Sequence, residues 1–179
     1  DTIADSKHGE TETLLDLLKS YNDVAQGRSD TLPDFSHIAK IQTNENEAKL
    51  LQNVQDVVDG LGVYGEEDQQ RILECLEVIV AGQVLDLQRF GPANEGGKIS
   101  ALTNDEQLDD YTYRVAGCVG VFWTKMSLAH LMSLKPEKEA EFFEKGMPLF
   151  IQRNILGKIG WRRNESCGHF MDKLLFRTG

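Results

Sequence analysis

Cysteine is scarce in this chain, and its spacing excludes two common kinds of scaffold. Three cysteines occur among the 179 residues, and Cys75, Cys118 and Cys167 lie far apart. Because no Cys-x-x-Cys pair is present, neither a zinc knuckle nor a disulfide framework is predicted. Cys75 and Cys118 fall on apolar helical patterns, so we expect small buried side chains and, by default, a reducing compartment.

Long apolar runs and positive charge are also scarce. No run approaches the roughly 18 apolar residues that a membrane-spanning helix needs. The formal net charge is −10, which argues against nucleic acid as a partner, because nucleic-acid binding relies on Lys and Arg. An anionic ligand would need a cation such as Mg²⁺ between carboxylates and phosphate oxygens. The chain begins with Asp1 rather than Met, so organelle targeting stays open.

No segment has the alternating pattern that would predict a strand, and nearly every periodic segment has the helical period. Gly27 is a suitable helix stop, and the stretches around Pro33 and over residues 91–104 have loop composition. We therefore predict an all-α domain of five or six helices. The expected helices span about residues 11–26, 46–60, 66–90, 109–133 and 137–146.

The stretch from Asp109 to Met126 is the most distinctive. One apolar face is predicted from residues at three- and four-residue steps, namely Leu108, Tyr111, Val115, Val119, Phe122 and Met126. Gly117 and Gly120 fall inside this helix, although a helical glycine costs up to about 1 kcal/mol against alanine. They indicate either close packing on a neighbour or space beside the helix for a long apolar ligand.

Two acidic patterns are candidates for a site. Asp1 and Asp5 would share one face of a helix, about 5–6 Å apart at Cβ, and a cation could bridge them. On pattern alone, a solvated acidic helix start is the commoner explanation. Asp86 lies one turn beyond Gly82, and its pattern favours an exposed acid on a polar helix face. In the alternative interpretation, Gly82 allows a neighbouring helix to approach closely, and Asp86 faces the polar entrance of a cavity.

The aromatic start of the central helix allows two interpretations. Tyr111 is either a core aromatic or a hydroxyl group in a cavity, acting as hydrogen-bond donor or proton carrier. Arg114 is expected to pair with Asp110, four residues before it, for a few tenths of a kcal/mol. The four histidines show no metal-ligand spacing, and no phosphate loop or serine nucleophile motif is present.

Together these segments resemble one known family. The run Tyr111-Thr-Tyr-Arg-Val-Ala-Gly-Cys-Val-Gly120 is similar to the Tyr-x-x-x-Val-Ala-Gly-x-Val-Gly signature of squalene and phytoene synthases. Asp1-Thr-Ile-Ala-Asp5 resembles the family's first Asp-rich motif, Asp-x-x-x-Asp. The segment from Gly82 to Leu87 resembles its Gly-x-x-x-Asp-Leu element. We therefore predict a partial catalytic domain over residues 1–146 and a divergent basic segment over residues 147–179.

The resemblance implies an isoprenoid-synthase-like helical bundle around an apolar cavity, truncated here. It implies a prenyltransferase that condenses two prenyl diphosphates, farnesyl or geranylgeranyl diphosphate, head to head with Mg²⁺-assisted diphosphate release. The product would be squalene, dehydrosqualene or phytoene, and NADPH would be needed if squalene forms. The roles carried over are two metal ligands, Asp1 and Asp5, one catalytic residue, Tyr111, and four substrate-binding residues, Asp86, Gly117, Gly120 and Asn154.

The C-terminal segment departs from the family pattern. The family has a second Asp-rich motif, roughly Gln-x-x-Asn-Ile-x-Arg-Asp-x-x-x-Asp. If Asn154 matches the motif's asparagine, Lys158 and Arg162 stand where its aspartates should be. Two cations there would repel Mg²⁺, so we expect this chain alone to turn over poorly. The alternative is a catalytically inactive helical relative that binds a lipid or a protein partner. We expect a protein in the cytoplasm or peripheral at a membrane.

Overall fold

The structure, a computed structural model, describes residues 2–4, 10–94, 102–131, 138, 140 and 141. Over these residues every regular element is helical, which confirms the all-α prediction. The elements are α1 (Thr11–Ala25), α2 (Ser36–Ile41), α3 (Glu45–Gln52), α4 (Val54–Asp59), the 3₁₀ turn η1 (Gly60–Val63), α5 (Glu66–Asn94), α6 (Asp105–Thr112), the π-helical turn η2 (Tyr113–Gly117) and α7 (Cys118–His130). Of the described helices, none combines the length and apolarity needed to cross a membrane.

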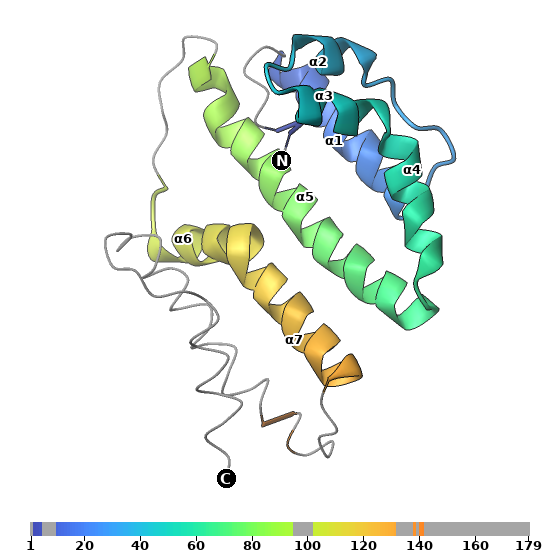
Figure 1. Ribbon diagram of the computed structural model, residues 1–179. Coiled ribbons are helices and arrows are strands. Elements are labelled where there is room, and N and C mark those ends of the chain that lie inside the picture. Colours follow the sequence, from blue (N-terminus) through green and yellow to red (C-terminus); the bar gives the residue numbers. More distant parts are fainter. Residues whose placement is uncertain (1, 5–9, 95–101, 132–137, 139, 142–179) are drawn as a thin grey trace.

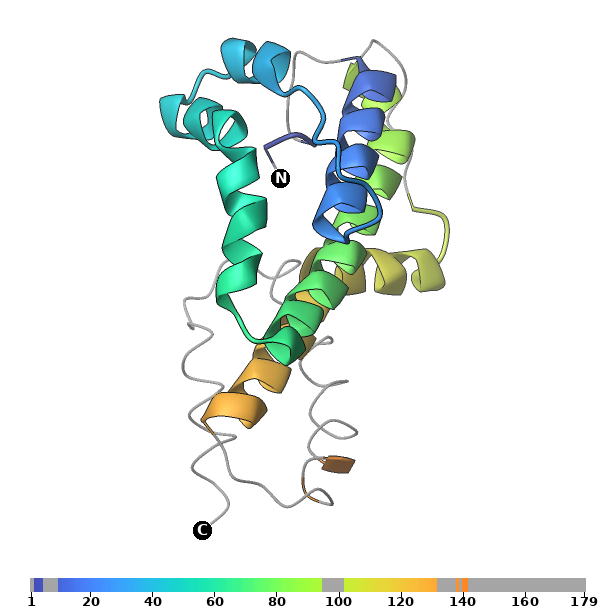
Figure 2. The ribbon, with the colours of Figure 1, turned by 90° about the vertical axis from the view of Figure 1, so that its right-hand side faces the viewer.

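The long helix α5 organises the fold. Figure 1 shows it running diagonally through the molecule, with α1–α4 on one side and α6 and α7 on the other. Figure 2, turned by 90°, shows α1 alongside α5, and α7 near the beginning of α5. The first turn of α5 carries three acids, Glu66, Glu67 and Asp68, which favour the positive end of the helix dipole.

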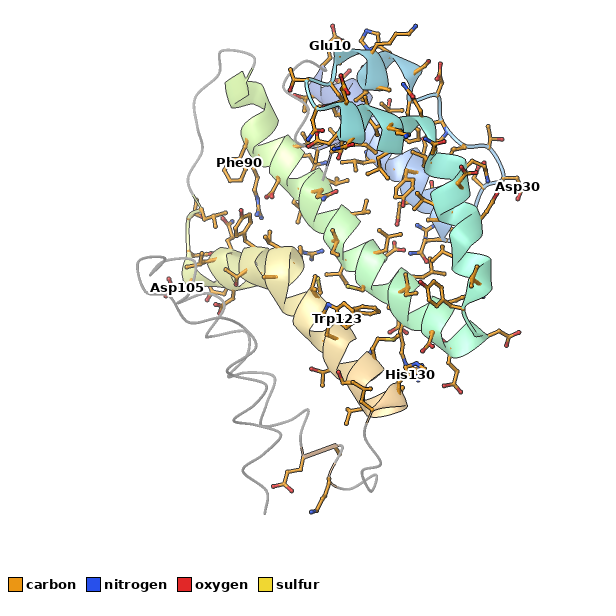
Figure 3. All side chains as sticks on the ribbon, viewed as in Figure 1. Glu10, Asp30, Phe90, Asp105, Trp123 and His130 are labelled. Carbon is orange, nitrogen blue, oxygen red and sulfur yellow. The ribbon has the colours of Figure 1, made fainter. Side chains whose placement is uncertain are left out.

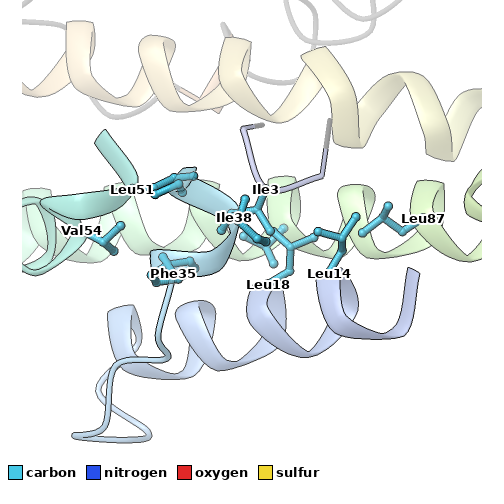
Figure 4. Close-up of a cluster of buried hydrophobic side chains, with 10 residues drawn as sticks. Ile3, Leu14, Leu18, Phe35, Ile38, Leu51, Val54 and Leu87 are labelled. Carbon is cyan, nitrogen blue, oxygen red and sulfur yellow. The ribbon is translucent and has the colours of Figure 1, made fainter. Parts of the chain in front are cut away.

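The main buried core lies between α5 and the helices α1–α4 (Figure 4). Leu18 of α1 and Ile38 of α2 are its largest fully buried side chains. Ile3 from the N-terminal turn joins the same cluster, together with Val80 and Leu87 of α5. Burying each such side chain contributes about 1.5–3 kcal/mol. The N-terminal turn is therefore held by the same core as α5.

The predicted boundaries are confirmed for α1 and partly for the next helix. Gly27 has φ +69°, the left-handed conformation expected of a helix stop. The helix expected over residues 46–60 divides at Asn53, whose side-chain amide donates to the Lys49 carbonyl at 2.6 Å. Leu50 and Val57 are apolar residues of this segment, but they are 50% and 48% exposed rather than buried in the core. The short helix α2 was not predicted.

The central helix differs most from its prediction. It begins at Asp105, after Asn104, whose side chain accepts a hydrogen bond from the Gln107 backbone N–H. It is then interrupted by η2, and a π turn inserts an extra residue that shifts the helical phase by about 100°. Val115 is consequently 36% exposed, so its predicted inward orientation was wrong. The buried positions are instead Thr112, Gly117, Cys118, Gly120 and Leu128.

Of the last expected helix, over residues 137–146, three residues are described. Lys138, Ala140 and Glu141 are all helical. The other positions of that segment, like residues 147–179, lie outside the described residues.

The second packing contact of α5 is its approach to η2. A Cβ placed on Gly82 would lie 2.8 Å from the Cβ of Arg114, closer than real side chains pack. The interpretation that Gly82 allows close helix approach is therefore confirmed. Farther along the two helices, Lys125 donates to Glu74 at 2.8 Å. α5 and the α6–α7 segment thus run antiparallel along a shared contact.

Gly82→Ala should destabilise the protein, because the added methyl group must push the Arg114 backbone away. We expect a net loss of about 1–2 kcal/mol, the overpacking cost minus the helix propensity that alanine gains. Gly62→Ala is the matched control, since a Cβ there meets nothing within 4 Å. Urea unfolding followed by circular dichroism measures both changes. A Gly82→Ala protein as stable as the Gly62→Ala protein would contradict this packing.

Candidate functional site

The first component of the site is Asp86, one turn beyond Gly82 on α5. Its side chain is partly buried, and its Oδ1 atom is inaccessible to solvent. The interpretation of Asp86 as an exposed acid was therefore wrong. The sequence pattern favoured exposure because it shows only the helix that carries Asp86 and not the segment packed against it. The close approach at Gly82 brings η2, and with it the end of α6, against this part of α5.

Tyr111 of α6 is the second component, and it lies near Asp86. The pKa of the Tyr111 phenol is raised, mainly by burial and further by the negative charge of Asp86. A phenol with a raised pKa stays protonated through the neutral range, so it acts as a hydrogen-bond donor rather than a base. The structure thus brings together two of the residues that the sequence singled out separately.

Arg114 adds a cation beside this pair. Its Nε–H donates to both carboxylate oxygens of Asp110, at 2.8 and 3.0 Å, which confirms the predicted pairing. The two side chains are 30% and 41% exposed, so the ion pair contributes little to stability. Its effect is to hold Arg114, whose Cβ packs on Gly82.

Gly117 and Gly120 follow at the junction of η2 and α7, and both are buried. The hydroxyl of Thr124 donates to the Gly120 carbonyl at 2.8 Å. Beyond these glycines, α7 carries Trp123, which is 60% exposed and packs edge-on against Phe122 (Figure 3).

Two open grooves lie on the described residues, and neither includes the predicted site residues. One, of about 520 Å³, lies between α1 and α5 and is also lined by Arg114. The other, of about 410 Å³, lies over the beginning of α5. Tyr111, Asp86, Gly117 and Gly120 line neither of them.

Asn22 of α1 is a polar residue that the sequence analysis missed. It is 8% exposed, lines the larger groove, and its Oδ1 has no hydrogen-bond partner among the described residues. The available signal was its position four residues after Leu18, on the buried stripe of α1. A polar residue on an apolar stripe is easily taken for an interruption of the pattern.

The metal ligands expected from the sequence, Asp1 and Asp5, lie outside the described residues, as does Asn154. Within the described part of the chain, no group of three or more His, Cys, Asp or Glu side chains could hold a metal. The segment between the two aspartates, residues 2–4, forms a turn. Its Ile3 is buried in the same cluster as Leu87, the neighbour of Asp86.

The pairing of Asp86 with Tyr111 predicts a specific change in titration. Because the carboxylate charge disfavours the phenolate, Asp86→Asn should lower the Tyr111 pKa towards its ordinary value. The measurement is a spectrophotometric pH titration of tyrosinate absorbance, with Tyr111→Phe used to isolate the Tyr111 contribution. Asp59→Asn, on the distant helix α4, is the control. An unchanged Tyr111 titration in Asp86→Asn would show that the two groups do not interact.

Comparison with known proteins identifies a family whose match includes α5 and α6, the helices that carry Asp86 and Tyr111. A family model described as squalene/phytoene synthase matches residues 1–147, which include all three motifs and both Asp86 and Tyr111. No curated protein and no solved structure matches the chain. The matching family consists of prenyltransferases that join prenyl diphosphates head to head. The chain belongs to the squalene/phytoene synthase family.

Proposed function

We propose that the contact between α5 and α6–α7 is part of the prenyl diphosphate site of a head-to-head prenyltransferase. The observation that carries this proposal is the proximity of Asp86 and Tyr111. They come from two separate motifs that the family match covers, and one side chain shifts the pKa of the other. At this partly buried contact the Tyr111 hydroxyl can donate a hydrogen bond to an anionic substrate, whereas the Asp86 carboxylate would reach phosphate oxygens through a cation such as Mg²⁺.

Tyr111 is the proposed catalytic residue. Its protonated hydroxyl donates to an oxygen of the departing diphosphate, where negative charge develops. Asp86 raises the Tyr111 pKa and so keeps that proton on the phenol. Burial of this contact also limits water, which would otherwise capture a carbocation formed from the substrate.

Asp1 and Asp5 are the proposed metal ligands. Carboxylates are the donors that Mg²⁺ prefers, and their neighbour Ile3 is held in the core cluster that includes Leu87. When bound, Mg²⁺ would supply Lewis-acid stabilisation of the leaving diphosphate. Asn154, outside the described residues, is assigned to substrate binding.

The hydrocarbon chains are assigned to the side of Gly117 and Gly120, two buried helical positions that carry no side chain. Farnesyl or geranylgeranyl diphosphate is the proposed substrate, and squalene, dehydrosqualene or phytoene the product. NADPH would be consumed only if squalene forms, because that product requires a reduction.

Release of inorganic diphosphate tests the function. The full chain is incubated with farnesyl or geranylgeranyl diphosphate and Mg²⁺, with and without NADPH, and the lipid products are identified. We expect release that requires Mg²⁺, at a low rate in view of the basic residues Lys158 and Arg162. Neither release nor a thermal shift with a diphosphate analogue and Mg²⁺ would contradict the proposal. A shift without release would instead support the inactive, ligand-binding relative.

Variants separate the proposed roles. Tyr111→Phe should lower release by roughly 10²-fold or more, as for loss of a positioned proton donor. Its control is Tyr64→Phe, since Tyr64 is 52% exposed and far from this contact.

Asp5→Ala should lower release by about 10²-fold or more, because Lewis-acid stabilisation is worth several kcal/mol. Its control is Asp16→Ala, an exposed acid of α1. Equal losses in a variant and its control would remove the residue from the assigned role.

A further inference from the structure

The groove between α1 and α5 combines an apolar floor with charged walls. Its volume of about 520 Å³ lies within the range of small-molecule sites. The α5 side of the groove is apolar and consists of Val80, Ala81, Val84 and Leu85. All of these except Val80 are only partly buried. A hydrocarbon chain laid along this side of α5 would therefore remove apolar surface from water, which favours binding.

One end of the groove is already neutralised by the protein itself. Arg28 donates from Nε to Asp23 at 2.9 Å and from its two terminal nitrogens to Glu77 at 3.1 and 3.4 Å. All three side chains line the groove. Because one guanidinium serves two carboxylates, this end keeps no cation for a ligand and does not attract an anion.

Two other cations of the groove retain free donors. Arg114 donates from Nε to Asp110, whereas its two terminal nitrogens have no hydrogen-bond partner among the described residues. Lys19 of α1 forms no ion pair with any residue that the structure describes. A guanidinium and an ammonium bind phosphate oxygens directly, without a metal ion between them. An anionic head group is therefore expected beside Arg114 and Lys19.

Asn22 supplies an independent sign of a ligand in the same groove. It is 8% exposed, lines the groove, and its Oδ1 has no hydrogen-bond partner in the described part of the chain. A buried polar group without a partner lowers the stability of the fold. Since the amide can turn about its terminal bond, it can present either its oxygen or its N–H group. A polar ligand group would provide the partner that the described residues do not.

We propose that this groove is a second ligand site, which binds a single hydrocarbon chain with a phosphate head group. The chain lies along the apolar side of α5, and the phosphate oxygens accept hydrogen bonds from Arg114, Lys19 and Asn22. Because side chains supply the positive charge, binding needs no Mg²⁺. The site goes beyond the proposed function, since neither Tyr111 nor Asp86 lines the groove.

Decyl phosphate is a suitable probe, added to the full chain in the presence of EDTA and followed by isothermal titration calorimetry. We expect a dissociation constant of roughly 0.1–1 mM, because an open groove covers only one side of a small ligand. From octyl to decyl phosphate the affinity should rise about twofold per methylene, half the effect of full burial. Decyl glucoside, with an uncharged head, and inorganic phosphate, without a chain, should both bind at least about tenfold more weakly.

Charge-removing variants test the two cations. Arg114→Gln should weaken the binding of decyl phosphate about tenfold, as for loss of hydrogen bonds to a charged group. Lys19→Gln should weaken it about threefold or more, because this ammonium is more exposed. Arg89→Gln and Lys49→Gln are the matched controls, since they remove the same charges from residues that do not line the groove. Circular dichroism verifies that each variant is folded.

Asn22→Leu separates a ligand contact from a purely structural role. Removal of an unpaired buried polar group should raise the melting temperature by about 2–4 °C. The affinity for decyl phosphate should nevertheless fall about fivefold, because one contact to the head group is lost. A variant that is more stable and binds with unchanged affinity would contradict the assigned contact.

The site would be excluded by binding that requires Mg²⁺, or by equal affinities for decyl phosphate and inorganic phosphate. It would also be excluded if Arg114→Gln and Lys19→Gln bound the probe as tightly as their controls. Weaker binding in Tyr111→Phe but not in these variants would place the probe at the prenyl diphosphate site instead, which equally overturns the groove as its binding site.

Discussion

The contact of Gly82 with Arg114 is the constraint on which the rest of the site depends. A Cβ at position 82 would lie 2.8 Å from the Arg114 Cβ, so only glycine allows α5 and η2 to approach this closely. This contact fixes the antiparallel register of α5 and α6–α7. The register in turn places Asp86 near Tyr111, one turn from Gly82 along α5, and Glu74 beside Lys125, about two turns away in the other direction.

Much of this arrangement was accessible from the sequence, for identifiable reasons. Helical periodicity predicted α1 and α5, since both have continuous apolar stripes that pack on each other. Glycine inside a helix is unfavourable by itself, so close helix approach at Gly82 was the alternative that the sequence allowed beside the favoured interpretation of an exposed polar face. The motifs indicated the family, which the match over residues 1–147 shows.

Other features could not be predicted because they arise between segments. The burial of Asp86 depends on the segment packed against α5, which no pattern within α5 reveals. No characteristic amino-acid composition marks the π turn in the sequence. The turn changes the helical phase, that is, the side of the helix on which each later residue lies, and this is why Val115 was assigned to the wrong face. The division of α3 from α4 depends on the Asn53 side chain bonding to the backbone. α2 has six residues, too few for an apolar repeat to be recognised.

The central claim is that a prenyl diphosphate lies at the contact of α5 with α6–α7. The most direct measurement is photo-crosslinking of the full chain with a prenyl diphosphate that carries a photoreactive group on its hydrocarbon chain, in the presence of Mg²⁺, followed by peptide mapping. We predict adducts in peptides from residues 66–94 and 105–130 that unlabelled prenyl diphosphate suppresses. Adducts confined to residues 11–59, or adducts that the unlabelled substrate does not suppress, would contradict the account.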